Sequence, residues 1–345
     1  MAIAAEIPDL DIFTQVGGSV FGFQHHRGFT HSFVGLPLDA AGALLIVWGI
    51  HRLRGRWRER QGKPAPQVAP RWGLLFIFGL IASASHILLD FTNQYGVRPF
   101  IPFSYRWYHW DIVSIVEPVL TLALLLGLIM PTLFALIQEE IGAKRTHGRG
   151  GAVVALLLVA LIWGVRDYEH RRALAAVSAL EYGEQLPLRI SAFPYMTNPF
   201  QWYAIVETES AFHQMDVDSL TPEVDPRRRA RIHYKQPDTP VTEAAKKSYL
   251  GRVYLDWADY PILEVQKLAP GEDIGEGRLE RLTWQGVPGG NGGDDEPSPG
   301  GYLVRLIDLR YAYPDRPRVL RAAVQLDAND NVVAFYFGLR REKAN

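Results

Sequence analysis

The stretch WGLLFIFGLIASASHILLD, residues 72–90, decides how this sequence is interpreted. It is long and apolar enough to cross a bilayer as a helix, because about 20 such residues span the hydrocarbon. Two ionisable residues, His86 and Asp90, stand near its end. Positions i and i+4 share one face of a helix, so the imidazole and the carboxylate should point the same way. Ionisable groups are costly in hydrocarbon, which makes this pair a candidate functional site.

A second group of histidines precedes another apolar run. The stretch HHRGFTHS, residues 25–32, contains His25, His26 and His31. His26 and His31 are five residues apart, so they do not share a helix face, and a loop that enters the following helix is predicted. Two histidine groups at two helix ends predict a metal site assembled at one face of a membrane.

The predicted metal site also draws on a turn at residues 7–11, which carries two carboxylates. Imidazole binds an ion at neutral pH and carboxylates lower its net charge, a mixture that suits zinc, with manganese as the alternative. A single histidine at a helix end is more often a hydrogen-bonded interface residue, so the convergence of the whole set favours a metal. The predicted ligands are Asp9, Asp11, His26, His31, His86 and Asp90.

Three further residues are candidates for a role beside the metal. Arg27 is predicted to be a clamp for an anionic group, with the alternative of an interfacial arginine that pairs with Asp9 or Asp11. Glu117, at the start of the third apolar run, is predicted to be a ligand, a general base or a residue that orients a ligand histidine. Asp39 is expected either to orient a ligand or to form a hydrogen bond between helices.

The alternation of apolar runs and polar stretches predicts the fold class: a polytopic α-helical membrane bundle of about four spans, followed by a soluble β-rich (α+β) domain. The apolar runs are residues 33–50, 72–89, 112–137 and 151–165. Predicted strands are residues 202–206, 251–255, 302–307 and 332–337, with a hairpin turn at 327–331 and an exposed Gly/Pro-rich loop at 286–301. We expect a membrane-embedded domain over residues 1–166, a helical connector over 167–185 and the β-rich domain over 186–345.

Composition excludes several classes of protein. The net charge of −1 provides no basic field for nucleic acid, so no nucleic-acid partner is expected. The absence of cysteine excludes disulfides, zinc–thiolate sites and a cysteine nucleophile. The composition leaves the oligomeric state open.

The distribution of lysine and arginine predicts the orientation in the membrane. Residues 51–71 contain seven of them and residues 138–150 contain three, against three in the segments on the opposite side. The positive-inside rule places these basic loops in the cytoplasm. The metal site and the β-rich domain are then expected on the outer face of a bacterial inner membrane.

The same residues resemble the YdjM-like (LexA-regulated) family of membrane-bound metal-dependent hydrolases. The resemblance covers roughly residues 7–165 and is carried by PDLD at 8–11, HHRGFTHS at 25–32, HILLD at 86–90, YG at 95–96 and PFS at 102–104. It implies metal-dependent hydrolysis related to that of zinc-dependent phospholipase C-like enzymes, with the six predicted ligands as matching positions. Family members usually begin with an additional helix bearing Thr-His. We therefore expect either a start further upstream or one ligand fewer.

We thus expect an inner-membrane metal-dependent hydrolase that acts on a phosphoester or another lipid-soluble ester at the outer face. Asp11, Arg27 and Glu117 are its predicted catalytic residues. The alternative is a non-catalytic, membrane-anchored envelope protein whose β domain binds a partner. A transporter is disfavoured because the ionisable residues gather at one end of the runs rather than at mid-membrane.

Overall fold

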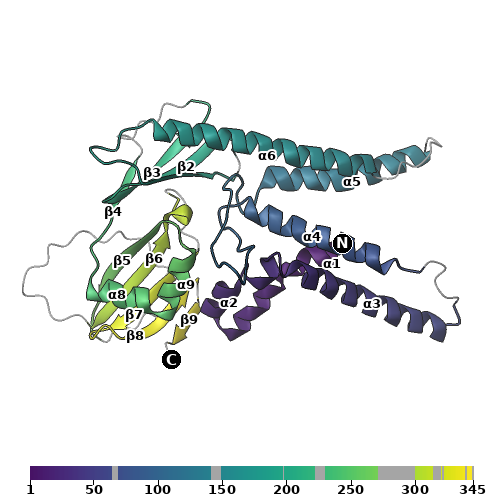
Figure 1. Cartoon of the computed structure of the whole chain (residues 1–345), viewed down its shortest axis with the longest axis horizontal. Coiled ribbons are helices and arrows are strands. Elements are labelled where there is room, and N and C mark those ends of the chain that lie inside the picture. The colour runs from purple at the N-terminus through teal and green to yellow at the C-terminus, as the bar shows by residue number, and fades with distance from the viewer. Residues whose placement is uncertain are drawn as a thin grey trace, which may run out of the picture. The chain divides into compact units, whose positions relative to one another are not determined.

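The structure is a computed structural model that describes residues 1–63, 69–140, 149–196, 198–221, 230–270, 300–313, 320, 322–338 and 340–343. The chain divides into two compact units, each containing helices and an antiparallel sheet (Figure 1). The first unit comprises Met1–Leu89, Val97–Tyr108 and Lys235–Asn345, and the second comprises Asp90–Gly96 and His109–Tyr234. The boundary after Leu89 lies within one continuous helix.

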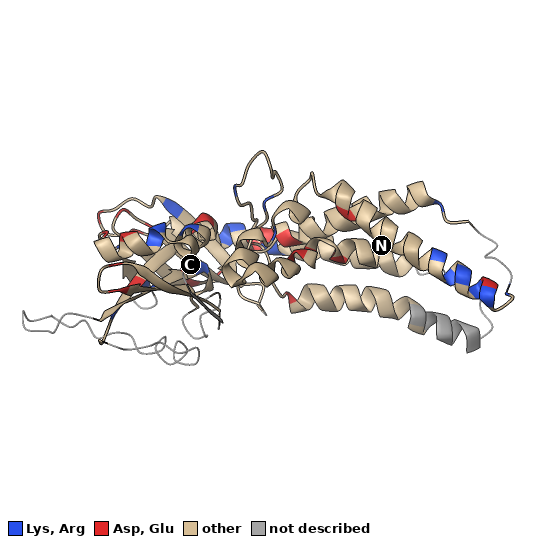
Figure 2. Cartoon of the chain, turned by 90° about the horizontal axis from the view of Figure 1, so that it is seen from below, with Lys and Arg blue, Asp and Glu red and all other residues tan. Residues whose placement is uncertain are grey.

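The N-terminal part of the first unit consists of four short helical elements followed by two long helices. These are α1 (Ala2–Glu6), η1 (Pro8–Gly17), α2 (Ser19–His25), η2 (Phe29–His31), α3 (Leu36–Arg60) and α4 (Trp72–Phe91). A Cβ atom added to Gly79 would lie 3.3 Å from the Cβ atom of Ala40. The small residues Gly79 and Ala40 therefore let α3 and α4 approach closely. The basic residues of α3 gather in its last turns (Figure 2), at the end opposite its start at Leu36.

The short helix α1 packs against α3 and α4. Ala4 and Ile7 form a buried cluster with Ala43 of α3 and Ala82 of α4. The Ser83 hydroxyl donates a 2.8 Å hydrogen bond to the Ala4 carbonyl oxygen. The N-terminal segment is therefore fixed beside the apolar parts of both long helices, a contact that the sequence analysis did not predict.

The second unit joins two long helices to a four-stranded sheet. Its helices are α5 (Pro118–Glu140) and α6 (Arg149–Ser178), and its strands, in sheet order, are β1 (Arg189–Pro194), β2 (Gln201–Glu207), β3 (Ala211–Asp218) and β4 (Arg231–Tyr234). A Cβ on Gly127 would lie 2.3 Å from the Ala155 Cβ, so α5 and α6 meet at a glycine. The helix α6 is 30 residues long, so it extends from the fourth apolar run into the predicted helical connector at 167–185.

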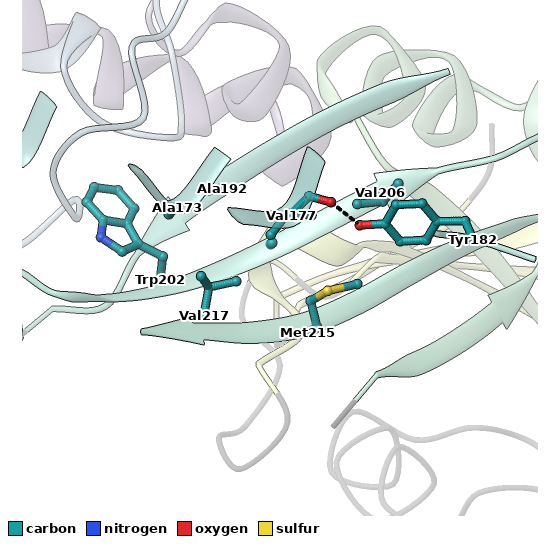
Figure 3. Close-up of a cluster of buried hydrophobic side chains, with 9 residues drawn as sticks. Ala173, Val177, Tyr182, Ala192, Trp202, Val206, Met215 and Val217 are labelled. Carbon is teal, nitrogen blue, oxygen red and sulfur yellow. Dashed lines mark hydrogen bonds between the residues drawn. The ribbon is translucent and has the colours of Figure 1, made fainter. Parts of the chain in front are cut away.

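The last turns of α6 cover one face of the four-stranded sheet. Ala173 and Val177 of α6 are buried against Trp202 of β2 and Met215 of β3 (Figure 3). The Tyr182 hydroxyl donates a 2.8 Å hydrogen bond to the Val177 carbonyl oxygen, which closes the end of this core. A single helix thus carries an apolar, span-length part and a part that packs on the sheet.

The second sheet belongs to the first unit. Its strands are antiparallel in sequence order: β5 (Pro261–Leu268), β6 (Gly301–Asp308), β7 (Ala322–Asp327), β8 (Val332–Phe337) and β9 (Arg340–Lys343). The helices α8 (Pro240–Lys247) and α9 (Tyr249–Trp257) precede it, and the short helix η3 (Leu309–Tyr311) follows β6. The predicted strands at 202–206, 302–307 and 332–337 and the hairpin turn at 327–331 are confirmed.

An aromatic contact docks this sheet on the N-terminal helices. The buried ring of Phe23 in α2 lies 5.4 Å from the ring of Trp257 in α9 and 4.5 Å from that of Phe337 in β8. The Tyr249 hydroxyl donates a 2.7 Å hydrogen bond to the Gln24 side-chain oxygen. The C-terminal part of the chain therefore packs directly on α2.

This docking gives a first prediction. Replacement of Phe23 by leucine keeps an apolar side chain but removes the ring contacts, which are worth about 1 kcal/mol. We expect the free energy of unfolding of the first unit to fall by about that amount, measured by urea unfolding of the full chain in detergent micelles with far-UV circular dichroism. Phe21→Leu is the matched control, because Phe21 lies on the same helix, is partly exposed and stacks only on His25 among the ring contacts of the described residues. An equal loss in both variants would contradict the docking role.

Three of the four predicted spans meet the length and composition of a membrane-crossing helix among the described residues: α3, α4 and α6. In α5 the apolar part with described side chains, Pro118–Pro131, is shorter than a span. The helix also starts six residues later than the predicted run, at Pro118, a residue type that favours the first turn of a helix. The chain is thus a helical membrane part followed by two antiparallel sheets.

One predicted strand is wrong. Residues 251–255 belong to the helix α9, which Ser248 caps by accepting a hydrogen bond from the backbone N–H of Gly251. The buried residues Leu250, Val253, Tyr254 and Trp257 follow the i, i+3, i+4, i+7 spacing of a helix, a period that cannot be recognised in the five residues 251–255 alone. Most of the predicted loop at 286–301 lies outside the described residues, and Gly301 begins β6.

Candidate metal centre

Short elements bring the candidate ligands of the N-terminal region together. The 3₁₀-helix η1 carries Asp9 and Asp11 in its first turn, where the sequence analysis predicted only a turn. After α2 the chain reverses at Arg27, whose φ of 49° is left-handed, and η2 then presents His31. A Cβ on Gly28 would lie 2.7 Å from the His25 carbonyl oxygen, so this reversal requires glycine.

Helix α4 supplies the other two candidate ligands. His86 and Asp90 are one turn apart in its last turns, as the spacing predicted. One ligand atom from each of Asp9, His31, His86 and Asp90 lies within 4.8 Å of the others. Residues from three segments of the sequence thus converge on one point.

Two histidine nitrogens of this cluster lie near one carboxylate oxygen. The Nε2 atoms of His31 and His86 each lie 3.4 Å from the same oxygen, Oδ1 of Asp9. Their rings are 5.2 Å apart between centroids and nearly edge to face, so the two nitrogens approach from different directions. The His31 side chain is fully buried, whereas that of Asp9 is 49% exposed, so the cluster opens on the Asp9 side.

These separations fit a tetrahedral ion. Bonds of about 2.0–2.1 Å at the tetrahedral angle place neighbouring ligand atoms about 3.3 Å apart. The two N–O separations of 3.4 Å match that value and are longer than a usual hydrogen bond. Two imidazoles and two carboxylates also suit a divalent ion of the zinc or manganese type.

Asp11 lies behind the cluster and contacts its histidines. Its Oδ1 is 3.0 Å from Nδ1 of His26, and its Oδ2 accepts a 2.7 Å hydrogen bond from the Arg27 backbone N–H. The same Oδ2 is 3.4 Å from Nδ1 of His31, and Thr30 Oγ1 is 3.2 Å from that nitrogen. Asp11 therefore contacts Nδ1 of His31, the ring nitrogen on the side away from Asp9. Residues that orient a metal-binding histidine contact it at the nitrogen that does not bind the metal.

The histidines keep both aspartates ionised. The side-chain interaction with His31, followed by that with His86, lowers the pKa of Asp9 well below its usual range. For Asp11, burial is the largest influence and raises the pKa, but the interactions with the His26 and His31 side chains outweigh it and lower the pKa. Both carboxylates are thus in the charged form that binds a cation.

The remaining predicted residues have different surroundings. Arg27 is buried, and the contact it makes with Asp11 runs through its backbone N–H. Asp39, in the first turn of α3, is buried within electrostatic reach of His31 and His86. Glu117 belongs to the second unit, where both its carboxylate oxygens accept 2.8 Å hydrogen bonds from Nη2 of the buried Arg166.

One supporting residue did not emerge from the sequence. The buried Arg98 donates hydrogen bonds from Nη2 to the carbonyl oxygens of Gln24 and His26, at 2.7 and 3.2 Å, and its guanidinium lies 4.4 Å from the Trp107 ring centroid. It therefore fixes the backbone where the chain leaves α2. The available signal was an arginine near the tryptophans of the segment between α4 and α5, and from sequence this arginine was used only for its charge.

The family assignment comes from comparison with known proteins. A family model described as YdjM inner membrane protein matches residues 1–173, which is half of the chain and includes every residue of the cluster. The chain belongs to the YdjM inner membrane protein family. The predicted resemblance is thereby confirmed, and the membrane-spanning character of the helical part agrees with the family's description.

Among curated proteins, the chain is similar to the "Uncharacterized protein YfhP" of Bacillus subtilis (strain 168), with 23% identity over 114 residues. The match spans 33% of this chain and 30% of that protein. No solved structure matches the chain. Residues beyond 173 lie outside the YdjM family model, so both sheets, β1–β4 and β5–β9, lie outside the family match.

Proposed function

We propose that this YdjM family member is an inner-membrane, metal-dependent hydrolase of a phosphoester or another ester. One observation carries the proposal: Nε2 of His31 and Nε2 of His86 lie 3.4 Å from the same oxygen of Asp9, the spacing of ligands around a tetrahedral ion. Four residues, Asp9, His31, His86 and Asp90, would hold the ion. When bound, a divalent ion would make a water molecule more acidic and draw electron density from the ester.

A histidine beside the cluster supports a role in proton transfer. Nδ1 of His26 is 3.0 Å from Asp11, and its side chain is 37% exposed, so the ring is both oriented by a carboxylate and open to a substrate. If Nδ1–H donates to Asp11, Nε2 is left to accept a proton. Asp11 is already engaged by His26 and by the Arg27 N–H, so we assign it to positioning rather than to proton transfer. Arg27 would receive the anionic part of the ester.

The proposed site faces the outer side of the inner membrane. The cluster lies at the start of α3 and the end of α4, whereas the basic residues lie at the end of α3 and in the following segment. The positive-inside rule would place those basic residues in the cytoplasm. The same orientation would put the C-terminal sheets outside the cell membrane.

Hydrolysis by the purified full-length protein tests the proposal. With zinc or manganese added, the wild type should hydrolyse a model phosphodiester such as bis-p-nitrophenyl phosphate. His86→Ala/Asp90→Ala should lower kcat/KM by at least about a hundredfold, because it removes two of four ligands. His26→Gln should lower kcat but retain the metal. His25→Ala is the matched control, since among the described residues the exposed His25 ring bonds only to its own helix, at the Phe21 carbonyl oxygen.

Equal activity in the double variant and the wild type would refute the hydrolase. The protein would then fit the alternative given by the sequence, a non-catalytic, membrane-anchored protein whose β-rich part binds a partner. In that case chelation would leave the thermal stability unchanged and no model ester would be hydrolysed.

A further inference from the structure

The 3₁₀-helix η1 has one apolar edge, and its two aspartates lie on the other two edges. Side chains three residues apart are eclipsed in a 3₁₀-helix, so Leu10, Phe13 and Val16 form a single ridge. This ridge points away from the protein: the three residues are 48%, 69% and 91% exposed. Asp11, on another edge, is buried against the histidines. The segment that supplies two carboxylates to the cluster thus presents a row of apolar side chains to its surroundings.

The position of α1 indicates what these surroundings are. Ala4 packs on Ala82 and accepts a hydrogen bond from Ser83, both of which lie within the apolar span of α4. Ser83 precedes Asp90 by seven residues, which corresponds to about 10 Å along a helix. The N-terminal segment therefore starts deeper along α4 than the cluster, and η1 continues directly from that depth.

The spanning helices in the same unit also expose apolar side chains. Leu38 and Leu45 of α3 are 60% and 67% exposed, and Ile81 of α4 is 54% exposed. Side chains of this kind on a membrane-crossing helix face lipid. Because η1 begins beside these helices, the same lipid is available to its ridge.

We propose that the ridge Leu10/Phe13/Val16 inserts into the bilayer at the boundary between acyl chains and headgroups, and that the metal cluster receives its substrate laterally from the membrane. The second part rests on the proposed hydrolase function. Asp9, the open ligand, directly precedes Leu10, so a lipid lying along the ridge would bring its headgroup to the cluster. The substrate class is an amphiphilic phosphoester held in the bilayer rather than a freely soluble one.

The absence of native cysteine allows a direct test of insertion. Val16→Cys is labelled with a nitroxide in the full-length protein, which is then reconstituted in phosphatidylethanolamine/phosphatidylglycerol vesicles. Electron paramagnetic resonance measures collision of the label with oxygen, which concentrates in lipid, and with a water-soluble nickel chelate. Two positions in the same unit provide references: Leu45→Cys on the exposed side of α3 and Asn329→Cys in the exposed β7–β8 turn.

We expect the Val16 label to resemble the Leu45 label, with oxygen collisions exceeding those with the chelate. A label that behaves like the one at Asn329 would overturn membrane insertion, whatever the protein hydrolyses. Spin–spin broadening at Val16 would show that a second copy of the chain covers the ridge and would overturn it as well.

A separate activity assay tests whether the substrate reaches the cluster laterally from the membrane. Phe13→Ser/Val16→Ser should lower kcat/KM about tenfold for a phosphodiester lipid embedded in vesicles, relative to its effect on soluble bis-p-nitrophenyl phosphate. Equal losses on the two substrates would overturn lateral access. If the wild type hydrolyses neither substrate while the Val16 label lies in lipid, the hydrolase proposal fails and the inserted ridge stands.

Discussion

Replacement of His86 by alanine is expected to lower the affinity for zinc by about 10²–10³-fold. Four-ligand zinc sites bind with about 10–16 kcal/mol in total, so one ligand accounts for about 3–4 kcal/mol. Removal of the Nε2 that lies 3.4 Å from Asp9 Oδ1 leaves three of the four clustered donors. Competition with a chromophoric chelator, using the full-length protein in detergent, measures the change.

A graded series makes this prediction specific. Asp11→Asn should cost less, about 10–100-fold, because Asp11 orients His31 and His26 without belonging to the group of four. His25→Ala should leave the affinity unchanged. If His86→Ala binds zinc within threefold of the wild type, or if the three variants lose affinity equally, the assignment of ligands is wrong.

The second large effect concerns the buried ion pair of Glu117 and Arg166. Both side chains are 2% exposed, and Arg166 also donates hydrogen bonds to the carbonyl oxygens of Asn198 and Tyr195. Arg166→Met would leave the Glu117 carboxylate buried without its cation, which typically costs about 3–5 kcal/mol. We expect a loss of that size in the free energy of unfolding of the second unit, measured by chemical denaturation in detergent.

The double variant separates the pair from general packing. Glu117→Gln/Arg166→Met removes both charges and should recover most of the loss, because the penalty comes from an uncompensated buried charge. If the double variant is as unstable as the sum of the single variants, the coupling between the two side chains is absent. Glu117→Gln alone should also leave zinc affinity unchanged if its role is to pair with Arg166.

Much of the helical part was predictable because its signals are local. The i, i+4 spacing of His86 and Asp90 predicted their common face, and the structure brings both into the cluster. The length of an apolar run is likewise a local property, which is why α3, α4 and α6 were found. The convergence of Asp9 and His31 with this pair followed from residue type and from the expectation of a shared membrane face.

Other features depend on contacts between distant segments. The ring of Phe23 meets those of Trp257 and Phe337, and no pattern within α2 identifies partners so far along the chain. Glu117 illustrates the same limit: its residue type suits a ligand or a base, but the buried Arg166 that contacts it is identified only by the fold. The different roles of Asp9 and Asp11 also required the structure. Both are aspartates in the same turn, yet Asp9 lies near Nε2 of His31 and Asp11 lies near its Nδ1.

The helix α9 was predicted as a strand because a five-residue alternating pattern fits either period. Its cap at Ser248 and the buried positions up to Trp257 become decisive only over the whole element. The 3₁₀-helix η1 was missed for a related reason, since runs of this conformation longer than three or four residues are uncommon. Its apolar ridge emerges only when a three-residue repeat is applied.

X-ray absorption at the zinc edge tests most directly the claim that Asp9, His31, His86 and Asp90 hold one ion. For the full-length protein we predict about one zinc per chain, nitrogen and oxygen ligands at about 2.0–2.1 Å, and the outer scattering of two imidazoles. His31→Ala should remove one imidazole from that spectrum. A spectrum without imidazole scattering, or one that His31→Ala leaves unchanged, would contradict the account.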